Sequence, residues 1–375
     1  MAYIYEKKSL KMTGLYITFN RGGLYDADGE YGTSHLMEHL LCKTFKDEYS
    51  NLTKLNIDWN AYTSNELVVV HFTGMEKYFT GEVKTRLVKK LLGGISISRE
   101  EFETEKNVVL QEYMDSFNDP ETMGNVIREK FNYFGAIGRK ADIEKFSFED
   151  MQRHYELYYT KPNKIIEVGP SSTDFSFVNF AETPVVPARK LKYSDKNKNV
   201  ETEQLPENNK TTVRYLSKKM VSKSDYPALK TALVMLTGGL ESPMFNRIRV
   251  EKGLCYGVFG ITTNFITDAS VVFGATTDPK NKDALKNEFE YFFNDIKPHL
   301  TQERFNDVIQ SYAISEEENK IFRYKGINDV IRKGYVMIGK SYKKLTLEKV
   351  QEVAAKYINK DNLKLFFINE KVNND

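Results

Sequence analysis

The chain has 375 residues, of which 41% are hydrophobic and 28% are charged, so it is long enough for two domains and too apolar to be disordered throughout. Its 54 Lys and Arg residues against 52 Asp and Glu residues give a formal net charge of +2, which offers no electrostatic basis for a nucleic-acid partner. The two cysteines are too few for a disulfide framework, and no apolar stretch is long enough for a membrane helix or for the core of a signal peptide. We therefore expect a cytoplasmic protein without a nucleic-acid or membrane partner.

Local signals in the first half of the chain predict both strands and helices. The β-branched run Leu67–Thr73 is typical of a buried strand. Two capping boxes, Ser98–Glu101 and Ser147–Asp150, predict helix starts, because the Ser side chain accepts a backbone N–H while the acidic residue reaches back. The helix that begins at the first box should run to about Phe117.

The second half carries signals of the same kinds. Asp225 is positioned as the N-cap of a helix over Tyr226–Leu236, which Gly238 and Gly239 end. A later helix presents one apolar face, formed by Leu285, Phe289, Phe292, Phe293 and Ile296.

A proline-containing polar stretch over residues 184–211 separates the two halves and is predicted to be a linker. We therefore predict an α+β protein with domains at 1–183 and 212–375. Both halves close with a helix followed by a short strand, which hints at duplication. These closing elements are predicted at Phe148–Tyr158 with Lys164–Val168, and at Leu347–Tyr357 with Leu363–Ile368.

Two of the five histidines lie four residues apart, with a carboxylate between them. On a helix, His35 and His39 are separated by about 40° and one turn, so both imidazoles can bind one Zn²⁺. Glu38 lies about 60° to the side of His35, beside the metal. H-x-x-E-H is the inverted zinc-peptidase motif.

A third protein ligand is expected on the helix that begins at Ser98. Glu105, Val108, Val109 and Glu112 form one stripe, and the two valines predict that the stripe faces inward. A carboxylate on a buried face is costly unless it is paired or binds metal. We predict that Glu112 is the third zinc ligand and that Glu105 orients a ligand or the water.

The same residues also have interpretations that involve no metal. Two histidines at this spacing usually lie on the surface or pack in the core, but the His–Glu–His triplet is much rarer by chance. Cys42 lies on the same helix face, too far along the axis to share a metal with both histidines, and is expected to pack in the core. His71, in a predicted strand, is expected to be a satisfied core or sheet-face histidine, whereas His154 and His299 lie among polar residues and need no function.

Four segments resemble the pitrilysin and insulinase peptidases, which include the mitochondrial processing peptidase. The first, over residues 32–41, resembles the inverted zinc motif of the family. The others resemble its substrate-binding edge strand, its third-ligand segment and its glycine-led motif, in which an Arg and a Tyr lie seven apart. These three segments are Asn60–Ser64, Glu105–Glu112 and Gly238–Tyr256.

The resemblance implies that each half is an α+β domain with a mixed, mostly antiparallel sheet packed with helices, and that the chain is half of a four-domain clamshell. It also implies that substrate lies against the strand and is held by the Arg and the Tyr. The residues implied to bind substrate are Asn60, Ala61, Tyr62, Arg249 and Tyr256.

The leading hypothesis is a zinc endopeptidase that cleaves extended peptides or unfolded segments. One Zn²⁺ per chain would acidify a water, and Glu38 would take its proton. The alternative is a non-catalytic partner or assembly subunit that keeps the fold. A zinc-stabilised binding module is disfavoured, because structural zinc sites are usually rich in Cys. Since the chain carries both the zinc motif and the Arg249/Tyr256 motif, we expect a homodimer, with a heterodimer with a related subunit as the alternative.

Overall fold

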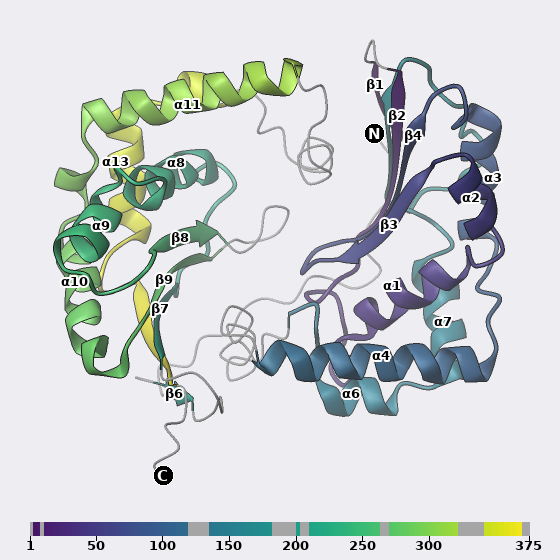
Figure 1. Cartoon of the computed structure of the whole chain (residues 1–375), viewed down its shortest axis with the longest axis horizontal. Coiled ribbons are helices and arrows are strands. Elements are labelled where there is room, and N and C mark those ends of the chain that lie inside the picture. Colours follow the sequence, from purple (N-terminus) through teal and green to yellow (C-terminus); the bar gives the residue numbers. More distant parts are fainter. Residues whose placement is uncertain are drawn as a thin grey trace. The chain divides into compact units, whose positions relative to one another are not determined.

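The structure is a computed structural model that describes residues 3–7, 11–118, 135–181, 200–202, 210–262, 270–321 and 341–369. It divides into two compact units, Met1–Leu191 and Lys192–Asp375 (Figure 1). Most of the linker predicted at 184–211 lies outside the described residues. Its described part is not a linker, because Val200–Thr202 forms strand β6 and Thr211 begins strand β7 of the second unit.

The first unit contains a five-stranded sheet in the order β1-β5-β2-β4-β3. Strands β1 and β5 are parallel, and the other neighbouring pairs are antiparallel. The elements of this unit are β1 Tyr3–Lys7, β2 Met12–Phe19, α1 Thr33–Lys43, α2 Tyr49–Lys54, β3 Asp58–Thr63, β4 Val68–Met75, α3 Gly81–Leu92, α4 Arg99–Asn118, α6 Lys140–Lys145, α7 Phe148–Tyr158 and β5 Lys164–Gly169.

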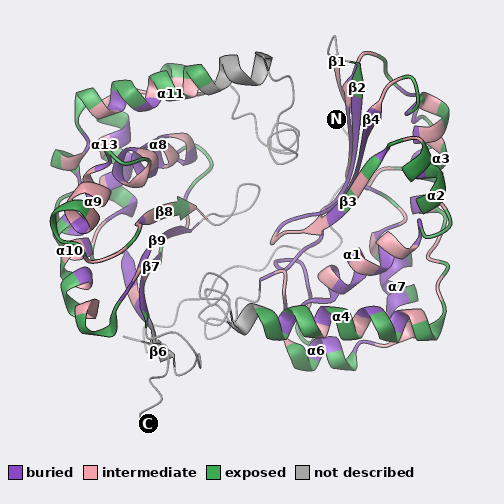
Figure 2. Cartoon of the chain, viewed as in Figure 1, coloured by how far each residue is buried: buried purple, intermediate pink, exposed green. Residues whose placement is uncertain are grey.

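The core of the first unit lies between this sheet and the helices. Alternate residues of β4, Val68, Val70 and Phe72, pack with Leu36 of α1 and Phe102 of α4. Figure 1 shows α1, α4 and α7 on one side of the sheet, and Figure 2 shows that the strands are largely buried whereas α4 has an exposed outer side. The sheet thus holds α1 against α4 through apolar contacts, which fixes the two helices that carry the predicted metal ligands.

The second unit repeats this topology. Its sheet has the order β6-β10-β7-β9-β8, with β6 and β10 parallel and the other neighbouring pairs antiparallel. Each strand occupies the place of one strand in the first sheet, so the prediction of two related α+β domains is confirmed. The elements are β6 Val200–Thr202, β7 Thr211–Ser217, α8 Tyr226–Thr237, α9 Pro243–Phe245, the π-helical turn η1 Asn246–Glu251, β8 Phe259–Thr262, β9 Val271–Thr277, η2 Pro279–Asn281, α10 Lys282–Asn294, η3 Lys297–His299, α11 Gln302–Ile321, η4 Ser341–Lys344, α13 Leu347–Tyr357 and β10 Leu363–Asn369.

The helices α4, α7 and α8 begin where the local signals predict, but one of the predicted caps is not formed. In the box before α4, the Ser98 N–H donates to Glu101 Oε2 at 2.7 Å and the Glu101 N–H donates to Ser98 Oγ at 3.1 Å. Asp225 precedes α8 as predicted, but its side chain does not cap the helix. It accepts instead from Lys356 Nζ at 2.7 Å and Tyr357 Oη at 3.0 Å, because α13 brings a cation and a hydroxyl to it.

In the residues that the structure describes, no helix has the length and apolarity needed to cross a bilayer.

Candidate metal centre

The helix that carries the His–Glu–His triplet begins at a buried carboxylate supplied from outside the helix. Gly32 precedes α1 with a φ of 95°, a conformation that favours glycine. Asp26, which is fully buried, accepts from the Gly32 N–H at 2.8 Å and the Ser34 N–H at 3.2 Å. Arg21 lies 3.4 Å from the same carboxylate. Asp26 thereby satisfies the N–H groups of Gly32 and Ser34 on either side of the first helical residue, which anchors the start of α1.

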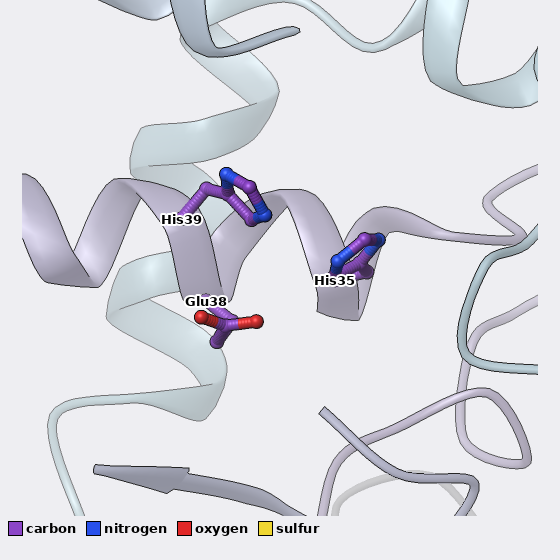
Figure 3. Close-up of side chains that lie close together, drawn as sticks. All are labelled: His35, Glu38 and His39. Atoms are coloured by element: carbon purple, nitrogen blue, oxygen red, sulfur yellow. The ribbon is translucent and has the colours of Figure 1, made fainter. Parts of the chain in front are cut away.

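His35, Glu38 and His39 project from α1 so that their ligand atoms lie within 4.8 Å of one another (Figure 3). Burial and the neighbouring His39 lower the pKa of His35 to about 4, so its ring is neutral and has a lone pair at neutral pH. Two imidazoles beside a carboxylate are a donor set that suits zinc.

Glu112 of α4 meets this group from the neighbouring helix. Its Oε2 lies 3.4 Å from His35 Nε2 and 3.7 Å from His39 Nε2. Ligand atoms placed at about 2.0–2.1 Å around a tetrahedral zinc lie about 3.4 Å apart, so the two distances from Glu112 to the histidines are compatible with one zinc ion. The side chain of Glu112 is 46% exposed, which places it at the edge of the site.

The prediction that the Glu105–Glu112 stripe faces inward is partly wrong. Val108 is 41% exposed, whereas Val109 is fully buried, so the predicted stripe does not face inward as a whole. The buried side of α4 consists of Phe102, Glu105, Val109 and Tyr113. Helix periodicity gives the angles between residues, but the packing of α4 on α1 decides which side is buried.

Glu105 is the buried carboxylate of this helix, and it contacts the other nitrogen of His39. Its Oε2 lies 3.4 Å from His39 Nδ1, and its Oε1 lies 2.7 Å from Lys43 Nζ. A proton on Nδ1, donated to Glu105, would leave the lone pair of His39 on Nε2, the nitrogen that faces Glu112. His35 Nδ1 is buried without a hydrogen-bond partner in the described part of the chain.

Glu38 lies beside the three converging atoms and is 8% exposed. Thr63 Oγ1 donates to Glu38 Oε2 at 3.4 Å, and the Cys42 thiol lies 3.8 Å from Oε1. Burial, as the largest cause, raises the pKa of Glu38 above the usual carboxylate value, which suits a general base. Cys42 packs against the core of the first unit as expected, but it is only partly buried and also lines the wall of the site, one turn from Glu38.

These side chains line one cleft of about 500 Å³ within the first unit. The strand β3 forms its other wall and contributes Asn60, Ala61 and Tyr62. In the described part of the sheet β3 is an edge strand that pairs with β4 on one side. An edge strand beside a cleft can pair with an extended peptide.

Arg249 and Tyr256 belong to the second unit and not to the unit that holds the cleft. Arg249 lies in η1, and its guanidinium carbon lies 4.5 Å from the Tyr256 ring centre and 4.8 Å from that of Phe245. Tyr256 is 85% exposed, which excludes a core role for it. The pair therefore presents a cation and a hydroxyl at the surface of the second unit.

Sequence reasoning missed several residues that support the cleft. Lys43 follows His39 by four residues, so the helical spacing that linked the histidines was a signal for it. Thr63 and Asp26 gave no such signal, because their contacts with α1 depend on how β3 and the preceding loop pack.

Two family profiles match the sequence. "Insulinase (Peptidase family M16)" matches residues 3–131, and "Peptidase M16 inactive domain" matches residues 145–312. The chain belongs to the insulinase family. The cleft residues, from His35 to Glu112, all fall within the first match, whereas the inactive-domain profile begins after them.

Similar proteins of this family carry different descriptions. "Non-peptidase homolog YmxG" of Helicobacter pylori is 22% identical over 95% of this chain and 87% of its own length. An "Uncharacterized zinc protease" of Rickettsia bellii is 20% identical over 85% of this chain and 81% of its own. A crystal structure from Pseudomonas fluorescens, described as a peptidase M16 inactive domain, has a TM-score of 0.79 and 16% identity, covering 99% of this chain and 95% of that one. This last similarity supports the fold of two sheets packed with helices.

Proposed function

We propose that this chain is a zinc-dependent endopeptidase that hydrolyses extended peptides or unfolded segments. One observation supports it above all. Glu112 Oε2 lies within 3.7 Å of the Nε2 atoms of both His35 and His39, and Glu38 stands beside them in the same cleft. One zinc ion held by these three residues would supply the Lewis acidity for peptide hydrolysis.

Residues of the chain itself would transfer the proton and bind the substrate. Glu38 accepts the proton of the attacking water and passes it to the leaving amine, and its raised pKa favours both transfers. Thr63 holds one of its oxygens in place. An extended substrate pairs through its backbone with the edge of β3, which tolerates varied side chains.

A non-catalytic partner or assembly subunit is the second candidate, and the name of the Helicobacter pylori relative favours it. Against it stands the gathering in one cleft of two histidines, the Glu112 carboxylate as a candidate third ligand, and the buried Glu38 as a candidate base. A protein that uses only the fold has no need of a buried Glu38, whose burial is costly.

The test compares zinc content and cleavage of an unstructured peptide. The wild-type chain should hold one zinc, and Glu38→Gln should keep it while kcat falls by about 10²–10⁴-fold. Glu100→Gln, an exposed carboxylate change on α4, is the control and should alter neither. A zinc-free wild type, or normal turnover by Glu38→Gln, contradicts the proposal. Bound zinc without turnover of varied unfolded substrates favours the non-catalytic candidate.

A further inference from the structure

We propose that Lys43 is a positioning residue of the zinc site, and that it acts by holding the Glu105 carboxylate against His39. The inference rests on the proposed zinc function and adds a residue to it. It follows from three groups that lie in a row between α1 and α4.

The row joins a cation, a carboxylate and a ligand ring. Lys43 Nζ lies 2.7 Å from Glu105 Oε1, and Glu105 Oε2 lies 3.4 Å from His39 Nδ1. The two contacts use different oxygens of one carboxylate. Because a carboxylate is planar, fixing one oxygen at Lys43 fixes the direction in which the other faces the imidazole.

Burial makes the row sensitive to the loss of its cation. The side chain of Glu105 is 10% exposed, and burying a carboxylate is costly unless it is paired. Lys43, whose side chain is 36% exposed, reaches Glu105 from the last residue of α1, one turn beyond His39. Without this ammonium, Glu105 loses a short charge-assisted contact, and its carboxylate is no longer held in its present orientation.

The consequence should appear in zinc affinity. An N–H at His39 Nδ1, donated to Glu105, would keep the lone pair on Nε2, and groups that orient a ligand in this way are worth about 10–100-fold in metal affinity. Lys43→Met keeps the apolar stem of the side chain and removes the charge, so it tests the cation and not the packing.

The chain offers a matched control. Lys46 Nζ lies 2.6 Å from Glu101 Oε1, an ion pair that also joins the end of the α1 region to α4. Their side chains are 47% and 35% exposed. Lys46→Met thus removes a comparable link between the same segments at a place remote from His39.

The experiment measures the zinc dissociation constant of the full-length chain by competition with a chromophoric chelator, with zinc-free melting temperatures measured in parallel. Lys43→Met should bind zinc about 10–100-fold more weakly, while Lys46→Met should match wild type. Lys43→Arg should restore most of the affinity, because its charge can reach the same oxygen. In a Glu105→Gln background, Lys43→Met should add little, since both changes break one row.

Each outcome bears on the inference. Equal losses in Lys43→Met and Lys46→Met, full additivity with Glu105→Gln, or no recovery in Lys43→Arg would overturn it while leaving the zinc site intact. A wild-type chain that binds no zinc would overturn both this inference and the proposed function.

Discussion

Replacing Asp26 by Asn should destabilise the first unit and loosen the start of α1, the helix that carries two of the predicted metal ligands. The change keeps the shape of the side chain but removes its charge and one acceptor. Oδ2 accepts from the Gly32 N–H at 2.8 Å, while Oδ1 accepts from the Ser34 N–H at 3.2 Å and faces Arg21 at 3.4 Å. An amide in either orientation must turn its NH₂ group toward a donor.

The expected cost follows from burial. The side chains of Arg21 and Asp26 are 5% and 0% exposed, so the variant leaves a buried guanidinium without its counter-charge, which costs about 3–5 kcal/mol. An unpaired buried N–H at Gly32 by itself costs about 1–3 kcal/mol. This cost overlaps with the loss of the ion pair, so the two costs do not add. We expect the free energy of unfolding to fall by about 3–5 kcal/mol.

The single tryptophan of the chain makes this measurable for the first unit alone. Trp59 lies in β3 and stacks on Tyr49 and Phe72, so its fluorescence reports unfolding of that unit. With an m value of about 2 kcal/mol per molar urea, the midpoint should drop by about 2 M. Asp28→Asn is the control, because Asp28 is exposed and its amide can still accept from Tyr31. A loss below about 1 kcal/mol for Asp26→Asn would refute the view that a buried ion pair anchors α1.

Three further outcomes follow from the site and its surroundings. Groups that only orient a ligand are typically worth roughly 10–100-fold in zinc affinity. Glu105→Gln should weaken zinc binding within that range, and Glu112→Gln should weaken it further. Chelator competition measures both affinities, and a larger loss for Glu105→Gln than for Glu112→Gln would exchange their roles. The zinc-free chain should lose stability as the pH falls from about 7 to 5, because burial lowers the pKa of His71 below its unfolded value near 6.5, so the unfolded state takes up the proton first. Urea titrations should show a smaller loss for His71→Gln, and an equal loss would exclude His71 as a source. We also propose a homodimer whose sites are completed in trans, so mixing inactive Glu38→Gln with inactive Arg249→Ala should restore part of the activity; no recovery after confirmed subunit exchange would contradict completion in trans.

The features that sequence predicted best depend on neighbours within one turn of a helix. The capping boxes at Ser98 and Ser147 are formed as expected, because each needs only residues three apart. The convergence of His35, Glu38 and His39 was predictable for the same reason, since α-helix geometry alone brings them to one side.

Features that depend on packing between elements were not predictable. His154 was placed among polar residues, but it is 2% exposed. It packs against the rings of Phe146 and Tyr158, and its Nε2 lies 3.3 Å from Glu30, which comes from a distant loop. Polar sequence neighbours on a helix point in other directions, so they say little about what one residue contacts in the fold.

The repeated topology separates what the fold provides from what the side chains provide. In the order of elements, α1 precedes the edge strand β3 in the first unit, and α8 precedes the edge strand β8 in the second. The twelve residues of α8 include no histidine and no carboxylate, and most of them are buried in the apolar core. The same position is thus a packing helix in one unit and a cleft-lining helix that carries the His35, Glu38 and His39 group in the other. Because α8 lacks these donors, we propose that α1 and not α8 provides zinc ligands, at one zinc ion per chain.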